Sequence, residues 1–159
     1  MAQDAPLRSA GVHFPPPFIY LIGFLTGWLL DRVWPAPLPQ VAPPLRYVII
    51  ALFLIVWLVL MLGAFAKFML ARTAIIPNRA ASMVVTSGPY RFTRNPMYVG
   101  LAALYLAIAL FYGSWWLIVW LFPVLLVVRY AVIAREERYL TSAFPDEYPA
   151  YCSRVRRWL

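Results

Sequence analysis

The sequence predicts an all-α, polytopic membrane protein, because the chain is too apolar for a soluble domain of its size. Hydrophobic residues make up 64% of its 159 positions and charged residues 13%, whereas soluble domains carry about 25% charged residues. A chain this short cannot bury so much apolar surface, so the excess is expected to face lipid. We expect a single domain, residues 1–159, with about four transmembrane helices, a C-terminal helical hairpin and a surface amphipathic tail.

The first predicted span covers residues 14–34, where Asp31 and Arg32 interrupt the far end of the apolar run. The run resembles a signal peptide in having a basic residue ahead of it. The prolines that open it, and the lack of a clean small-residue cleavage site, favour a retained span. Gly23 and Gly27 form a Gly-x-x-x-Gly pair, which allows close helix packing within the chain or between two copies of it.

The second predicted span covers residues 46–68 and contains an uncharged run, Tyr47 to Ala66, of the length that crosses a bilayer. Between the first two spans, the Pro-rich connection from Pro35 to Pro44 suits a stiff, extended linker.

The last apolar region is too long for one crossing, because no residue from Asn95 to Val128 carries a formal charge. Gly113-Ser114 near its middle can form a tight turn. We therefore predict helices over 96–112 and 115–134, joined as a hairpin, with a kink at Pro123 in the second one.

Basic residues set the expected orientation in the membrane. The segment 69–95 with its flanks and the tail 135–159 hold most of them, whereas the Pro-rich connection and the hairpin tip hold no charge. The positive-inside rule then places both termini and the segment 69–95 in the cytosol, with the protein in the inner membrane if its source is bacterial. These basic residues are Lys67, Arg72, Arg79, Arg91, Arg94, Arg135, Arg138, Arg154, Arg156 and Arg157.

Composition argues against several other classes of function. The net charge is +8, but the basic residues border apolar runs, which points to membrane lipids as partners and not to nucleic acid. The only cysteine is Cys152 and the only histidine is His13, so no disulfide within the chain and no metal site is expected.

Two polar clusters border the predicted hairpin. The first, Ser87 to Gly100, runs into the third span; its arginines and the free N–H groups of the helix start make an anion site, or only a membrane-edge anchor. In the second, Arg129 lies inside an apolar run and shares a helix face with Glu136 and Glu137. A charged residue at membrane depth normally faces the bundle interior and has a partner, so an Arg129–glutamate pair that only locks helices is the alternative to a functional site.

An antiparallel hairpin brings the two clusters to one side of the membrane. One site would then hold arginines, a helix N-terminus and two carboxylates beside a lipid-facing cleft. That combination suits a zwitterionic, water-soluble cofactor that meets a lipophilic small-molecule or lipid substrate.

These motifs resemble the isoprenylcysteine carboxyl methyltransferase and phospholipid methyltransferase group of integral membrane enzymes. The family pattern is Gly-Pro-Tyr-x-x-x-Arg-His/Asn-Pro-x-Tyr-x-Gly, then Glu-Glu, then a tail with spaced tyrosines. The matching residues are Gly88-Pro89-Tyr90, Arg94 to Gly100, Glu136-Glu137, Phe144 to Tyr151, and Val155. Asn95 stands where carboxylate-methylating members have histidine, and Pro145 stands where the family usually has glycine.

The resemblance implies methyl transfer from S-adenosyl-L-methionine, bound in a cytosol-facing pocket of the C-terminal half. A glutamate would bind the cofactor's ammonium or ribose hydroxyls, and an arginine or the helix start its carboxylate. Arg94, Arg129 and Glu137 are the candidate catalytic residues, with an arginine orienting an acceptor carboxylate and Glu137 as base for an amine. The candidate cofactor-binding residues are Tyr90, Arg94, Asn95, Pro96, Tyr98, Gly100, Glu136 and Glu137.

Two other classes of protein stay open at this point. An NADPH-dependent sterol-type reductase has a similar C-terminal portion, but Leu101 stands where its first motif carries an acid. A non-catalytic membrane scaffold would explain the Gly-x-x-x-Gly pair and would bind no cofactor.

Overall fold

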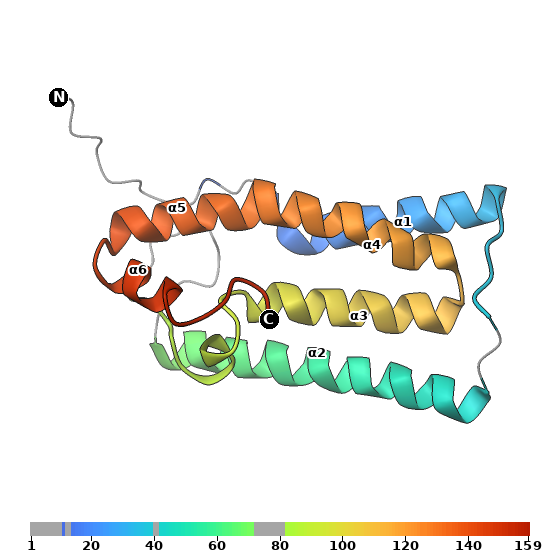
Figure 1. Ribbon diagram of the computed structural model, residues 1–159, viewed down its shortest axis with the longest axis horizontal. Coiled ribbons are helices and arrows are strands. Elements are labelled where there is room, and N and C mark those ends of the chain that lie inside the picture. Colours follow the sequence, from blue (N-terminus) through green and yellow to red (C-terminus); the bar gives the residue numbers. More distant parts are fainter. Residues whose placement is uncertain (1–10, 12–13, 40–41, 72–81) are drawn as a thin grey trace. The chain divides into compact units, whose positions relative to one another are not determined.

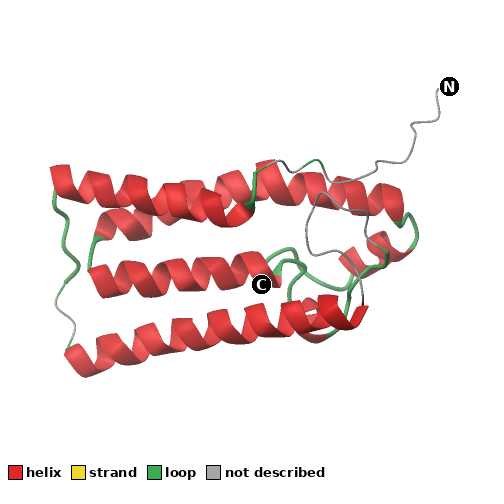
Figure 2. Ribbon diagram, turned by 180° about the vertical axis from the view of Figure 1, so that it is seen from behind, coloured by secondary structure: helices red, strands yellow, loops and turns green. Residues whose placement is uncertain are grey.

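The computed structural model describes residue 11 and residues 14–39, 42–71 and 82–159 (Figure 1). Throughout the described residues the chain is built of helices and loops, without a named strand (Figure 2). The predicted all-α class is confirmed. The elements are α1 (Pro16–Val33), α2 (Pro43–Ala71), the 3₁₀ turn η1 (Gly88–Arg91), α3 (Pro96–Tyr112), α4 (Trp115–Val127), the π-helix η2 (Val128–Ile133), α5 (Ala134–Ala143) and α6 (Glu147–Cys152).

Some sequence predictions fall outside the described residues. Arg72 and Arg79 of the predicted cytosolic segment are among them, as are His13 and part of the Pro-rich connection. The described residues group into two compact units: unit 1 holds those within 62–96 and 129–159, and unit 2 holds those within 14–61 and 97–128.

Unit 2 is organised by close packing of α1 on α4, which lie side by side (Figure 1). Gly23 and Gly27 are buried at this contact. A Cβ at Gly23 would overlap the Val124 side chain, and one at Gly27 would lie 3.2 Å from Cδ2 of Leu117. Small residues therefore let the two backbones approach, as they do in membrane helix pairs. Of the two uses foreseen for this Gly-x-x-x-Gly pair, the structure shows packing within the chain.

A short polar network joins the helix ends of unit 2 at the α3–α4 turn. Gly113 has φ of 87°, a conformation that favours glycine, and Ser114 caps α4 by accepting the Trp116 N–H. The Ser114 hydroxyl in turn donates to Asp31 Oδ1 at 2.5 Å. The Arg46 guanidinium donates to the Leu110 carbonyl at 2.6 Å, which satisfies an orphan acceptor at the end of α3. Arg46 thus caps the end of α3, and Asp31 supports the Ser114 cap of α4.

Unit 1 forms around the end of the chain. α5 continues the helix that starts at Trp115 as far as Ala143, beyond the predicted limit at residue 134. α6 then turns back beside α5. Tyr139, Tyr148 and Tyr151 are buried in this unit.

Within the described residues, two helices are long and apolar enough to cross a membrane: Pro43–Ala71 and Trp115–Ala143. The apolar helix α3 is shorter. Only 6% of the most apolar window of α2 is buried within the protein. A core helix of a soluble protein would instead be mostly buried, so this exposed apolar surface fits contact with lipid.

Gly23→Val should destabilise the protein, because the added methyl groups would collide with Val124 on α4. Overpacking of this kind costs about 1–3 kcal/mol. The measurement is the midpoint of thermal unfolding of the detergent-purified protein, with Ile22→Val, an exposed neighbour on the same helix, as control. If both variants melt like the parent, α1 does not pack on α4 through its glycines.

Candidate functional site

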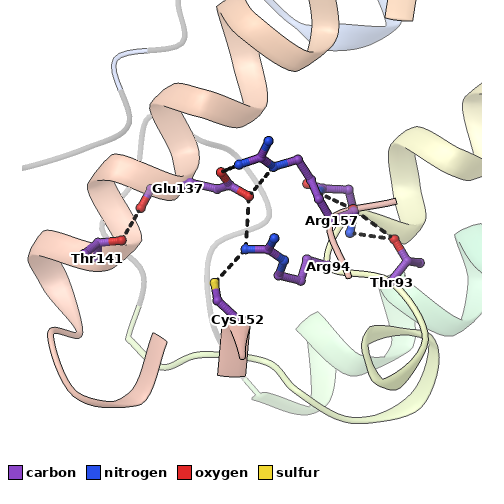
Figure 3. Close-up of polar contacts among 7 residues, drawn as sticks. Thr93, Arg94, Glu137, Thr141, Cys152 and Arg157 are labelled. Carbon is purple, nitrogen blue, oxygen red and sulfur yellow. Dashed lines mark hydrogen bonds and ion pairs between the residues drawn. The ribbon is translucent and has the colours of Figure 1, made fainter. Parts of the chain in front are cut away.

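The centre of the site is the Glu137 carboxylate on α5, which contacts two arginines within unit 1 (Figure 3). Arg157 donates to both carboxylate oxygens, from Nε at 2.8 Å and from Nη2 at 2.6 Å. Nη1 of Arg94 lies 3.2 Å from Oε1. Only 16% of the Glu137 side chain is exposed. Bidentate arginine–carboxylate pairing at a carboxylate with so little exposure to solvent is strong and orients both groups.

Arg94 reaches Glu137 from the loop between η1 and α3. Its Nη1 also lies 2.6 Å from Sγ of Cys152 at the end of α6 (Figure 3). Its Nε is buried and has no hydrogen-bond partner in the part of the chain that the structure describes. An unpaired buried donor on a charged group is costly, and at a functional site it marks a place for a ligand atom or water.

The C-terminal segment, Val155 to Leu159, is tied by its backbone to the loop before α3. The Arg94 N–H donates to the Arg156 carbonyl at 3.0 Å. The Arg157 carbonyl accepts from the Thr93 hydroxyl at 3.2 Å and from the Asn95 amide at 2.8 Å. Thr93 is fully buried, so its hydroxyl must be satisfied within the protein. These three bonds fix the chain end beside Glu137.

Three buried tyrosines support the arginine–glutamate cluster. Tyr151 donates its hydroxyl to the Tyr90 carbonyl at 2.6 Å. Burial raises the pKa of Tyr151 to about 12. Burial also raises the pKa of Tyr90, with a smaller contribution from the negative charge of Glu136, and raises that of Tyr148. All three phenols therefore stay protonated and neutral at physiological pH.

Most residues predicted for the site come together in unit 1. Tyr90, Arg94, Asn95 and Pro96 lie in or beside the loop before α3, and Glu137 contacts Arg94 directly. Glu136 lies on the same helix as Glu137 and acts on Tyr90 through its charge. Pro96 is buried at the start of α3, where its missing N–H costs nothing.

Tyr98 and Gly100, also predicted for the cofactor pocket, belong to unit 2. The Tyr98 carbonyl accepts a hydrogen bond from the Tyr20 hydroxyl at 2.9 Å. Gly100 is buried against α2, where an added Cβ would meet Leu60 and Met61 at van der Waals distance. Both residues serve helix packing there, and their part in a cofactor pocket stays a prediction.

Arg129 does not pair with Glu137, whose carboxylate is taken by Arg94 and Arg157. The Arg129 side chain is exposed, and its guanidinium lies 5.5 Å from the Tyr130 ring centroid. The expectation that it faces the interior was wrong, and the two arginines that bind Glu137 come instead from the loop before α3 and from the end of the chain. Residues 128–133 form a π-helix, and because a π-turn holds more residues than an α-turn, α-helical spacing does not give the relative orientation of Arg129 and the glutamates.

Sequence reasoning missed three members of the site: Thr93, Cys152 and Arg157. Arg157 was counted only among the basic residues that set the expected orientation in the membrane. Tyr148 and Tyr151 were expected on a membrane-surface tail, and instead they are buried in unit 1. Two tyrosines three residues apart on a helix share one face, and this spacing is the signal that the tail packs against the protein.

A wide, open depression lies beside the glutamate on α5, with a volume of about 600 Å³. It is lined by Ala134, Glu137, Arg138, Thr141 and Ser142. The cluster therefore lies next to surface that a ligand of cofactor size can reach.

The fold and the site define a helical membrane protein whose polar centre suits a ligand carrying both charge signs. The family model for phospholipid methyltransferases matches residues 41–147. The chain therefore belongs to the phospholipid methyltransferase family, as the motifs predicted, and is a membrane methyltransferase by family.

Among curated proteins, the chain is similar to an uncharacterized protein of Haemophilus influenzae. The two are 48% identical over 65 residues, which is 40% of this chain and 100% of that protein. No solved structure matches the chain.

Tyr151→Phe should destabilise the protein by about 1–3 kcal/mol, because the buried Tyr90 carbonyl loses its hydrogen-bond donor. The thermal midpoint of the variant checks this. Tyr130→Phe is the matched control, since Tyr130 is 65% exposed. Equal midpoints for the two variants would contradict a supporting role for Tyr151.

Proposed function

We propose that this protein transfers a methyl group from S-adenosyl-L-methionine to a lipophilic acceptor at the boundary of membrane and cytosol. The observation that carries this proposal is the Glu137 carboxylate held between Arg94 and Arg157 inside unit 1. Membership of a methyltransferase family gives the reaction class.

The charges of the cluster fit the amino-acid part of this cofactor. A zwitterion presents one ammonium and one carboxylate a few bonds apart. Glu137 is the acceptor for the ammonium. Arg94, whose buried Nε has no partner among the described residues, is the donor for the carboxylate. The residues present in the described part of the chain therefore fit the group that the family uses.

When bound, the cofactor supplies a methyl group on a sulfonium, which is already activated for transfer. The protein then has mainly to position the two reactants, and positioning alone can supply about 7–11 kcal/mol of barrier reduction. Tyr90, Tyr148 and Tyr151 provide a rigid, neutral support for the arginines. Arg129, exposed on η2, is placed to meet an acidic group of the acceptor.

The setting of the site supports a lipophilic acceptor. Glu137 lies towards the end of the apolar helix Trp115–Ala143, so the cluster borders the membrane-spanning part of that helix. The excess of arginines in 129–159 favours the cytosolic side for this end, and both termini with it. We propose a multi-pass protein with this topology; association of two copies stays a prediction.

The direct test is calorimetric titration of S-adenosylhomocysteine into the detergent-purified protein and into Glu137→Gln and Arg94→Gln. Loss of a charge-assisted contact costs about 1.5–3 kcal/mol, so each variant should bind about 10-fold to 100-fold more weakly. Glu147→Gln, an exposed glutamate in the first turn of α6, is the matched control and should bind like the parent. Parent-like binding in both site variants would refute the site.

The acceptor class can be found by incubating the protein with methyl-labelled cofactor and membrane extracts. Label should pass to an organic-extractable product, and much less of it with Glu137→Gln. Parallel extracts treated to block amines, or hydrolysed to release methyl esters, separate nitrogen from carboxylate acceptors. Label found only in water-soluble products would contradict a lipophilic acceptor.

A further inference from the structure

We propose that the Arg157 side chain is a cation gate, which competes with the cofactor's ammonium for the Glu137 carboxylate. This inference rests on the proposed function, because it takes Glu137 as the ammonium acceptor. It adds a regulatory contact: the cofactor must displace one guanidinium of the protein's own C-terminal segment before it is fully bound.

The geometry makes Arg157, and not Arg94, the displaceable cation. Arg157 occupies both oxygens of Glu137, at 2.8 and 2.6 Å, which are the atoms that an incoming ammonium would need. Its side chain is 35% exposed, so it can swing towards solvent. Arg94 is 14% exposed and is also held by Cys152, so it stays in place.

The backbone anchors keep the gate beside the site when the side chain leaves. The Arg157 carbonyl is bound by Thr93 and Asn95, and the preceding carbonyl is bound by the Arg94 N–H. None of these three bonds involves the guanidinium. The Arg157 guanidinium therefore acts as a tethered competitor. Its effective concentration at Glu137 is set by the few bonds between the anchored carbonyl and the guanidinium.

Thr93 and Asn95, which bind the Arg157 backbone carbonyl, flank Arg94, the arginine that meets the cofactor's carboxylate. A cofactor whose carboxylate binds Arg94 and whose ammonium binds Glu137 contacts both residues that flank the Arg157 side chain. Competition from the gate is thus specific to ligands that carry the amino-acid group. A ligand without that group leaves the Arg157–Glu137 pair in place.

The expected change in ligand affinity follows from how often the Arg157 side chain is away from Glu137. If the arrangement in which the Arg157 side chain has left Glu137 is a minor one, ligand binding is weakened. The apparent dissociation constant of the ligand is then its intrinsic constant divided by the fraction of protein in that arrangement. A partly exposed ion pair contributes up to about 1 kcal/mol, so removal of the Arg157 charge should tighten ligand binding by about threefold to fivefold.

The experiment compares the parent protein with Arg157→Ala in calorimetric titrations with S-adenosylhomocysteine and with 5′-methylthioadenosine. The second ligand keeps the nucleoside and the thioether and lacks the amino acid. Arg154→Ala is the matched control, since Arg154 lies three residues before Arg157 and its Nε donates to the Ala150 carbonyl of the neighbouring α6. Arg157→Gln is measured in the same way, and thermal midpoints verify that all variants fold.

The expected result is tighter binding of S-adenosylhomocysteine to both Arg157 variants, with unchanged binding to Arg154→Ala and unchanged binding of 5′-methylthioadenosine to every protein. Weaker or equal binding of S-adenosylhomocysteine to the Arg157 variants would overturn the gate alone, since the parent still binds. Equal tightening for both ligands would also overturn it, because the effect would not depend on the ammonium. Failure of the parent itself to bind either ligand would overturn the proposed function, and the gate with it.

Discussion

The site depends on one carboxylate. Glu137 lies on α5, yet its two ion pairs hold together the loop before α3 and the end of the chain, which are far apart in the sequence. Removing one partner of such a cluster leaves an uncompensated, poorly solvated charge. The backbone bonds of Arg156 and Arg157 to the same loop reinforce this arrangement, so the charge cluster and the chain end are positioned as one structure.

The parts of the fold that sequence could predict are those decided by local chemistry. Pro96 at a helix start and Gly113-Ser114 at a turn have strong intrinsic preferences, and α3 begins at Pro96 and ends at Tyr112, the limits expected from them. The meeting of Arg94 with Glu137 was expected from the hairpin, and the structure shows it directly. Asp31 and Arg46 were harder to interpret, because their hydrogen bonds to Ser114 and to the end of α3 depend on tertiary partners.

The parts that sequence could not predict depend on register and on long-range contacts. A single π-helical stretch, residues 128–133, changes which side chains share a face, and no residue pattern in it announces the change. α-Helical spacing assigned Arg129 to the cluster, but its side chain is exposed and its guanidinium lies over the Tyr130 ring. Arg157 fills that place from a segment 20 residues beyond Glu137, and Thr93 joins through a backbone carbonyl, for which side-chain identity gives no signal.

The mixed sign of the cluster also separates the two enzyme classes that the sequence left open. An NADPH-binding site must hold several phosphate groups, and proteins commonly bind such groups with arginines and free N–H groups. Here a carboxylate stands between the two arginines and would repel a phosphate placed there. A zwitterion meets no such conflict, since each of its charges has an opposite charge to face. The position of Glu137 thus favours a cofactor with an amino-acid group over a dinucleotide, in agreement with the family to which the chain belongs.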